Sequence, residues 1–140
     1  MESKRYGKEI VLRLDENDEL NACVEQACLE HGVRTARVSG IGAMKAAKLR
    51  VLNQSGDGFE FHEICRNMEI ASITGNVTAD EDGLMIHLHL AAADGSFRLV
   101  GGHVVSCIIT NTAEIWITET DGVIRRAQNA KGLLRRMELF

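Results

Sequence analysis

The chain has 140 residues, of which 45% are hydrophobic and 26% are charged, and its formal net charge at pH 7 is −4. This length and balance are those of one ordinary globular domain, so we expect a single domain over residues 1–140. Such a chain buries a core without disulfides or a structural metal. The acidic balance does not support direct DNA binding by this chain, because such binding usually needs a basic face that neutralises phosphates.

The sequence carries no signal for export or membrane insertion. Met1–Tyr6 is polar and lacks the apolar stretch that follows the charges of a secretory signal. No window approaches the ~20 apolar residues of a membrane span. The four cysteines have no CxxC spacing, which favours reduced and buried thiols. We therefore expect a cytoplasmic protein that does not contact a membrane.

Hydrophobic periodicity predicts one long helix near the amino terminus. Lys8–Leu14 alternates as a half-buried strand does. The acidic run Asp15–Asp18 then predicts a helix start, because carboxylates are favourable at the positive end of the helix dipole. Apolar residues recur at helical spacing up to His31, and Gly32 is typical of the residue just past a helix end.

Everything after Gly32 predicts strands separated by short turns. Gly42–Met44 is expected to separate two strands, Asn111–Thr112 to form a hairpin turn, and Asp80–Gly83 another turn. One helix followed by many antiparallel strands predicts the α+β class, with one long helix packed on a mainly antiparallel multi-stranded sheet. The expected strands are Arg34–Ile41, Ala46–Asn53, Phe59–Ile64, Met68–Val77, Leu84–Ala92, Phe97–Val100, Val104–Ile109, Ala113–Thr118 and Val123–Arg126, before an irregular tail.

The segment Met85–Leu90 carries the first two candidate metal ligands, His87 and His89. In a strand, residues i and i+2 point to the same face, so both imidazoles project together ~6–7 Å apart. That spacing lets two nitrogens reach one metal ion at ~2.0–2.1 Å. The alternative is a pair of histidines satisfied within the core or an interface.

His103 is the third candidate, because Gly101 and Gly102 precede it and a returning strand could bring it beside the pair. Three neutral imidazoles with an open fourth position predict a catalytic rather than a structural zinc site. The alternative is that the two glycines form a bulge and His103 merely packs. We expect neither His31, at the helix end, nor His62, on a surface strand, to be a ligand.

Four further residues are candidates from their type alone. Glu69 and Glu114 could orient a ligand histidine or transfer a proton, and Arg13 and Arg98 could bind a carboxylate. The alternative for all four is ordinary surface charge. The basic pairs Arg125–Arg126 and Arg135–Arg136 are interpreted as solvated surface.

From about Lys8 to Leu133 the chain resembles a PPC domain (plants and prokaryotes conserved). The resemblance implies a compact α+β domain that associates as a homotrimer, with a metal-site pattern at His87, His89 and His103. It also implies a fold related to acetolactate decarboxylase, whose zinc is held by a similar His-x-His pair and a distal histidine. The matching segments are Val11–Leu14, His31–Val33, Ser39–Ala43, Glu69–Asn76, His87–His89, Gly101–His103, Glu114 and Lys131–Leu133.

The resemblance leaves two functional hypotheses. Plant members join this domain to Arg-Gly-Arg-Pro segments that enter DNA, and prokaryotic members are named DNA-binding by that association. This chain has no proline and hence no such segment. The first hypothesis is a trimeric binding or assembly module whose metal site is structural or regulatory, with any role on DNA exerted through a partner. The second is a zinc-dependent enzyme that acts on a small acid or carbonyl compound, as acetolactate decarboxylase does, with that small molecule at the metal.

Overall fold

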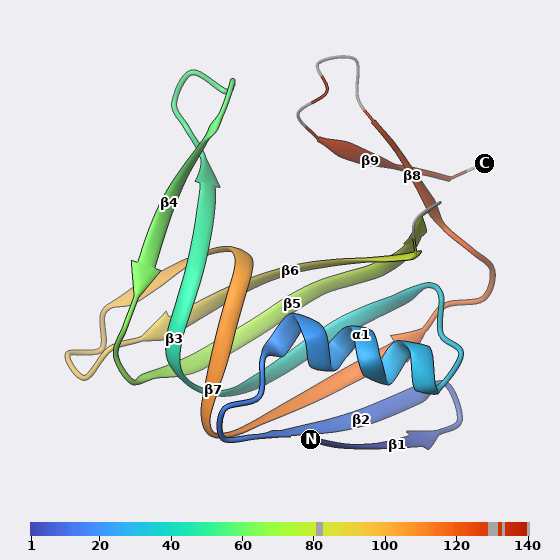
Figure 1. Ribbon diagram of the computed structural model, residues 1–140, viewed down its shortest axis with the longest axis horizontal. Coiled ribbons are helices and arrows are strands. Elements are labelled where there is room, and N and C mark those ends of the chain that lie inside the picture. Colours follow the sequence, from blue (N-terminus) through green and yellow to red (C-terminus); the bar gives the residue numbers. More distant parts are fainter. Residues whose placement is uncertain (81–82, 129–131, 133, 140) are drawn as a thin grey trace.

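The computed structural model describes residues 1–80, 83–128, 132 and 134–139, and strands make up most of them (Figure 1). The expected turn at Asp80–Gly83 and the segment Lys131–Leu133 therefore lie partly outside the described residues. In chain order the elements are β1 (Glu2–Tyr6), β2 (Glu9–Asp15), α1 (Leu20–Glu30), β3 (Ala36–Leu52), β4 (Phe59–Ile64), β5 (Met68–Asp80), β6 (Gly83–Ala93), β7 (Leu99–Glu119), β8 (Arg125–Gln128) and β9 (Arg135–Glu138).

The predicted α+β class with one long helix is wrong, because the protein is mainly β-sheet and α1 has only 11 residues. The helix begins at Leu20, where the Glu19 side chain accepts a hydrogen bond from the Ala22 amide. The acidic run before it forms a turn instead, since Asn17 adopts a φ of 74° and its amide donates to the Ile109 carbonyl. Tertiary hydrogen bonds to β7 thus replace the expected first helical turn.

Two predicted strand breaks are also wrong, because β3 and β7 each run through them. β3 has 17 residues and includes Gly42–Met44, and β7 has 21 residues and includes Asn111–Thr112. The two strands pair along their length, with register shifts on either side of Met44. A Cβ at Gly42 would lie 2.5 Å from the Ala113 Cβ, so the glycine permits close approach at a bend and does not mark a turn.

Four of the strands close into a ring. β3 pairs with β5, β5 with β6, β6 with β7, and β7 again with β3, all antiparallel. Beyond the ring, β2 and β1 extend from β7, β4 extends from β3, and β8 with β9 extends from β5. Figure 1 shows the β3–β4 and β8–β9 hairpins rising as two arms, with β5 and β6 running between their bases.

The core lies inside the ring and beneath the helix. The apolar face of α1, which includes Leu20, Val24 and Ala27, is fully buried and packs towards β2, β6 and β7. Strand residues that point inwards, such as Ile115 and Ile117 of β7, are also fully buried. Residues on alternate positions of the same strands face outwards, and the candidate metal ligands belong to this outer set. Within the described part of the chain, the 11-residue helix is too short to cross a membrane.

A glycine at the contact between β5 and β6 offers a test of the ring. A Cβ at Gly75 would lie 2.0 Å from the His87 carbonyl oxygen, whereas a Cβ at Gly95 would meet nothing within 4 Å. Because the backbone cannot yield locally, we expect Gly75→Ala to lower the free energy of unfolding by roughly 3 kcal/mol or more. The matched Gly95→Ala should change it by less than about 0.5 kcal/mol. Urea unfolding followed by fluorescence of Trp116 measures both, and equal stabilities would contradict the close contact.

Candidate metal centre

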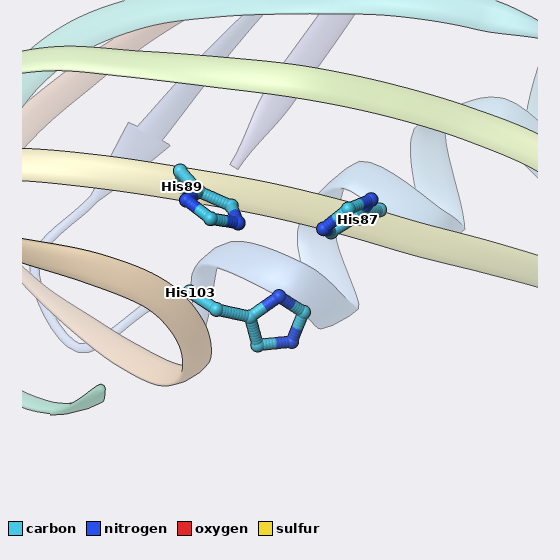
Figure 2. Close-up of side chains that lie close together, drawn as sticks. All are labelled: His87, His89 and His103. Atoms are coloured by element: carbon cyan, nitrogen blue, oxygen red, sulfur yellow. The ribbon is translucent and has the colours of Figure 1, made fainter. Parts of the chain in front are cut away.

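Three histidines from two neighbouring strands lie together on the outer face of the ring. His87 and His89 are two residues apart on β6, and His89 is the direct cross-strand partner of His103 on β7. Their ring centroids are 5.1–5.5 Å apart. One nitrogen from each ring lies within 4.8 Å of the others, and Figure 2 shows the rings grouped in this way. Three imidazole nitrogens at this spacing could hold a small divalent ion.

Glycines bring the backbone strands close enough for this grouping. A Cβ at Gly101 would lie 2.6 Å from the Leu90 carbonyl oxygen, and a Cβ at Gly75 would clash with His87 on the other side of β6. The pairing of β6 with β7 runs from Ala93↔Leu99 to His89↔His103 without a register shift. Gly101 and Gly102 therefore form no bulge against β6, and they place His103 in register with His89.

The surroundings favour neutral imidazoles, which are the form that binds a metal. Burial lowers the pKa of His103 to about 4, and the nearby Arg50 guanidinium contributes in the same direction. Burial also lowers the pKa of His87, with a further contribution from the charge of Arg126. Both rings are only partly buried, so their nitrogens remain accessible to a metal ion.

His87 contacts an arginine, although the usual neighbour of a metal-binding histidine is a hydrogen-bond acceptor. Arg126 Nη2 lies 3.3 Å from His87 Nδ1 and 2.7 Å from Asn76 Oδ1, while Arg126 Nε donates to Thr78 Oγ1 at 2.9 Å. A guanidinium has only donors, so Nδ1 must accept with its lone pair, and the hydrogen of the neutral ring then sits on Nε2. A metal at Nδ1 would replace Arg126, and a metal at Nε2 would move the ring hydrogen to Nδ1. In both cases the contact with Arg126 ends.

The histidines form part of the wall of a pocket between the two arms. The pocket has a volume of about 530 Å³, in the range of small-molecule sites. Its basic side chains come from β3, β8 and β9, and none of the described residues that line it is acidic. The lining residues are Arg50, Val51, Leu52, Phe59, Met85, His87, His89, Gly102, His103, Arg126, Gln128, Gly132, Leu134 and Arg135.

Comparison with known proteins gives the family. Residues 1–121 match the model of the Plants and Prokaryotes Conserved (PCC) domain. The chain belongs to this family. The bifunctional protein GlmU of a Synechococcus strain (JA-2-3B'a(2-13)) is 31% identical over 111 residues, which are 78% of this chain. The chain spans about a sixth of that protein, because the match covers only 16% of it.

Solved structures resemble this PCC domain over almost its full length. The "metal-containing protein" of Archaeoglobus fulgidus is 27% identical, with a TM-score of 0.85, and the match covers 96% of this chain and 95% of the other. A "putative DNA binding protein" of Bacteroides thetaiotaomicron is 23% identical, with a TM-score of 0.92 and coverage of 98% and 96%. At that identity the second likeness shows the fold alone.

Acetolactate decarboxylase of Bacillus subtilis shares part of this β-rich fold. It is 15% identical to the PCC domain with a TM-score of 0.59, and the match covers 86% of this chain and 57% of the enzyme. The relation between the two folds that the sequence resemblance implied is therefore seen in three dimensions. The likeness shows the fold alone, because one fold hosts many activities.

The four residues proposed from type alone lie away from the pocket lining. Glu69 is exposed and pairs with Ala93 at the far end of β6, and Glu114 is exposed on β7 opposite Arg13. Arg13 forms ion pairs with Asp15 and Glu2. Arg98 lies in the turn between β6 and β7, where it pairs with Asp94.

The remaining histidines lie where the sequence predicted. His31 caps the end of α1 and its Nε2 is 3.0 Å from Ser3 Oγ, and His62 is exposed on β4. Sequence reasoning missed Arg50 and Phe59, and it interpreted Arg126 as surface charge. No local motif marks any of these three, because they reach the site only through strand pairing.

The depressed pKa of His103 predicts that acid weakens the metal-free PCC domain. Between its ordinary value of 6.5 and about 4, the unfolded chain binds more protons at this ring than the folded chain does. The free energy of unfolding therefore falls as the pH falls through this window. Because the ring is partly exposed and screened, its contribution should be on the order of 1 kcal/mol.

Urea unfolding with a chelator present, at pH 4.5 and at pH 7, measures this effect. His103→Gln should remove that share of the pH dependence, whereas His62→Gln, at an exposed strand position, should retain it. An identical pH dependence in wild type and His103→Gln would contradict the assignment.

Proposed function

We propose that this PCC-family protein is a metal-dependent binding module that holds one zinc ion with His87, His89 and His103 and presents it to a small molecule. The observation that carries the proposal is the position of the three rings in the wall of a pocket of about 530 Å³. Among the described residues no fourth ligand joins the three histidines, so an ion held by them would be open to a ligand from the pocket. A purely structural zinc site would instead be closed by a fourth protein ligand.

The donor set supports zinc as the metal. Three imidazole nitrogens with one open position suit Zn²⁺, whereas Mg²⁺ and Ca²⁺ require oxygen ligands. The similar protein of Archaeoglobus fulgidus is named as metal-containing, which supports a metal in this fold. A zinc ion in the pocket would act as a Lewis acid towards an oxygen of the bound molecule.

An enzyme that acts on a small acid or carbonyl compound is the second candidate, and the open pocket is the observation that favours it. An acid–base reaction needs a proton-transfer group within hydrogen-bond reach of the substrate. Glu69 and Glu114, the carboxylates proposed for that step, lie outside the pocket lining. Binding therefore has stronger support than catalysis.

A cytoplasmic homotrimer is the assembly that we propose for the module, following the family resemblance. The outer face of the sheet offers apolar side chains for such contacts. Ile41 on β3 is 55% exposed, and Trp116 on β7 is 48% exposed. Exposed apolar residues of this size are typical of surfaces that a partner covers.

Zinc titration tests the proposed metal site. We expect one zinc ion per chain in the wild type, and at least ~100-fold weaker binding in His89→Ala, because two imidazoles hold the ion far less tightly than three. The matched control His62→Ala alters an exposed β4 histidine outside the cluster and should keep wild-type affinity. Competition with a chromophoric chelator measures all three proteins. Equal affinity of the wild type and His89→Ala would rule out the site.

Direct DNA binding is not part of this proposal. The net charge is −4, and the pocket has the volume of a small-molecule site, so its arginines are poorly placed for a duplex. In a mobility-shift assay with a 30-base-pair duplex at 150 mM salt, we expect no complex at 10 µM protein. A shifted band with this chain alone would overturn our interpretation of its charge.

A further inference from the structure

Two arginines reach the pocket from opposite arms and stand on either side of the histidines. Arg50 lies on β3 and is the cross-strand partner of His103, while Arg126 lies on β8 and contacts His87. Both line the same pocket. The two arms that carry them lie to the left and to the right of the β6 label in Figure 1.

Neither arginine is neutralised by a carboxylate among the described residues. Among the described residues, Arg126 donates to neutral acceptors, namely Asn76 Oδ1, Thr78 Oγ1, His87 Nδ1 and the Arg135 carbonyl oxygen. By contrast, four arginines elsewhere each lie within 4.0 Å of a carboxylate oxygen. These are Arg5, Arg13, Arg66 and Arg98.

Arg50 has a hydrogen-bond donor without an acceptor among the described residues. Its guanidinium carbon lies 4.4 Å from the centre of the Phe59 ring, which fixes one face of the group. Its Nε is buried and has no partner among the described residues. A buried donor without a partner is unfavourable, and a charged one more so, unless water or a ligand satisfies it.

The two charges also act against the metal site. Arg50 is the cross-strand partner of His103 and Arg126 contacts His87, so like-charge repulsion disfavours a cation at those rings. Two arginines without a carboxylate partner among the described residues, placed beside a proposed cation site, are understandable if an anion binds among them. The apolar part of the lining, Val51, Leu52, Phe59, Met85 and Leu134, suits an anion with a hydrocarbon body.

We propose that Arg50 and Arg126 form an anion-binding site that takes the carboxylate of a small organic acid whose apolar body lies against this lining. The inference deepens the proposed function by naming the chemical class of its ligand, and it rests on that function where it involves zinc. An arginine fork matches the two oxygens of a carboxylate, and both arginines line the pocket that would hold it.

Zinc should strengthen this site. Binding of a metal at either nitrogen of His87 ends the contact between its Nδ1 and Arg126 Nη2, while Asn76 still holds the other hydrogen of that nitrogen. One N–H then becomes available to a ligand in the pocket. The positive charge of the ion also attracts the anion. We therefore expect a small acid to bind the zinc-loaded protein more tightly than the metal-free protein.

Calorimetry with a matched pair of probes tests the proposal on the full chain. The probes are 3-methylbutanoate and its uncharged amide, which share one apolar body, and inorganic phosphate serves as a third. We expect the amide to bind at least about tenfold more weakly than the acid, because it has no negative charge and offers one acceptor oxygen instead of two. Equal binding of acid and amide, or tighter binding of phosphate than of the acid, would overturn the proposed ligand class.

Variants assign the effect to the two arginines. Arg50→Gln and Arg126→Gln should each weaken binding of 3-methylbutanoate by about tenfold or more, whereas Arg98→Gln, in the turn outside the pocket, should not. Their zinc affinity should stay equal or rise, because a like charge is removed. A damaged fold would instead weaken both ligands together, and thermal unfolding of each variant identifies that case. Wild-type acid binding in both well-folded arginine variants would overturn the proposal.

The two proposals fail in different ways. If the wild type binds no zinc, the metal module fails, while the comparison of acid with amide in metal-free protein still tests the arginines. If zinc binds to His87, His89 and His103 but acid and amide bind alike, only the anion site fails.

Discussion

The antiparallel pairing of β6 with β7 is the contact on which the other features depend. It closes the ring of β3, β5, β6 and β7, and it sets His89 opposite His103. Following cross-strand partners from Ser39 through Thr74, His89 and His103 leads back to β3 at Arg50, eleven residues further along. This stagger, which any closed set of strands requires, places an arginine of the β3–β4 arm beside the histidines. Closure of the ring therefore encloses the core and also brings the residues of the pocket together.

Local patterns predicted the elements whose signal is local. The alternation in β2, β4 and β6 gave strands close to those observed, and the i, i+2 spacing placed His87 and His89 on one face. β1 and β9 were missed because they are polar segments at the edges of the sheet. Neither has the alternation of apolar and polar residues that predicts a half-buried strand. The glycines of β3 and the Asn111 region of β7 have the composition of turns, but long-range pairing keeps both strands continuous. The size of the helix was overestimated because Asp15–Asp18 satisfies its hydrogen bonds through β7.

The residues of the candidate site also differ in whether a local sequence pattern could predict them. Its histidines could be proposed from the sequence because His87 and His89 have the i, i+2 spacing of one strand face, and Gly101–Gly102 precede His103. Arg50 and Arg126 come from strands 76 residues apart, and no spacing relates them to the histidines or to one another. Arg126 also sits beside Arg125 in a pair that has the composition of solvated surface. Only the closed sheet reveals that one member of that pair turns towards Asn76 and His87.

The short chain distance between the proposed metal ligands has a consequence for the order of folding. His87, His89 and His103 all belong to the single β6–β7 hairpin, whose arms are joined by the tight turn from Asp94 to Arg98. Closing that hairpin costs far less chain entropy than joining β3 to the end of β7. The three histidines can therefore come together in this hairpin before the ring closes. A metal ion bound at that stage would keep β6 and β7 in register while β3 and β5 pair with them.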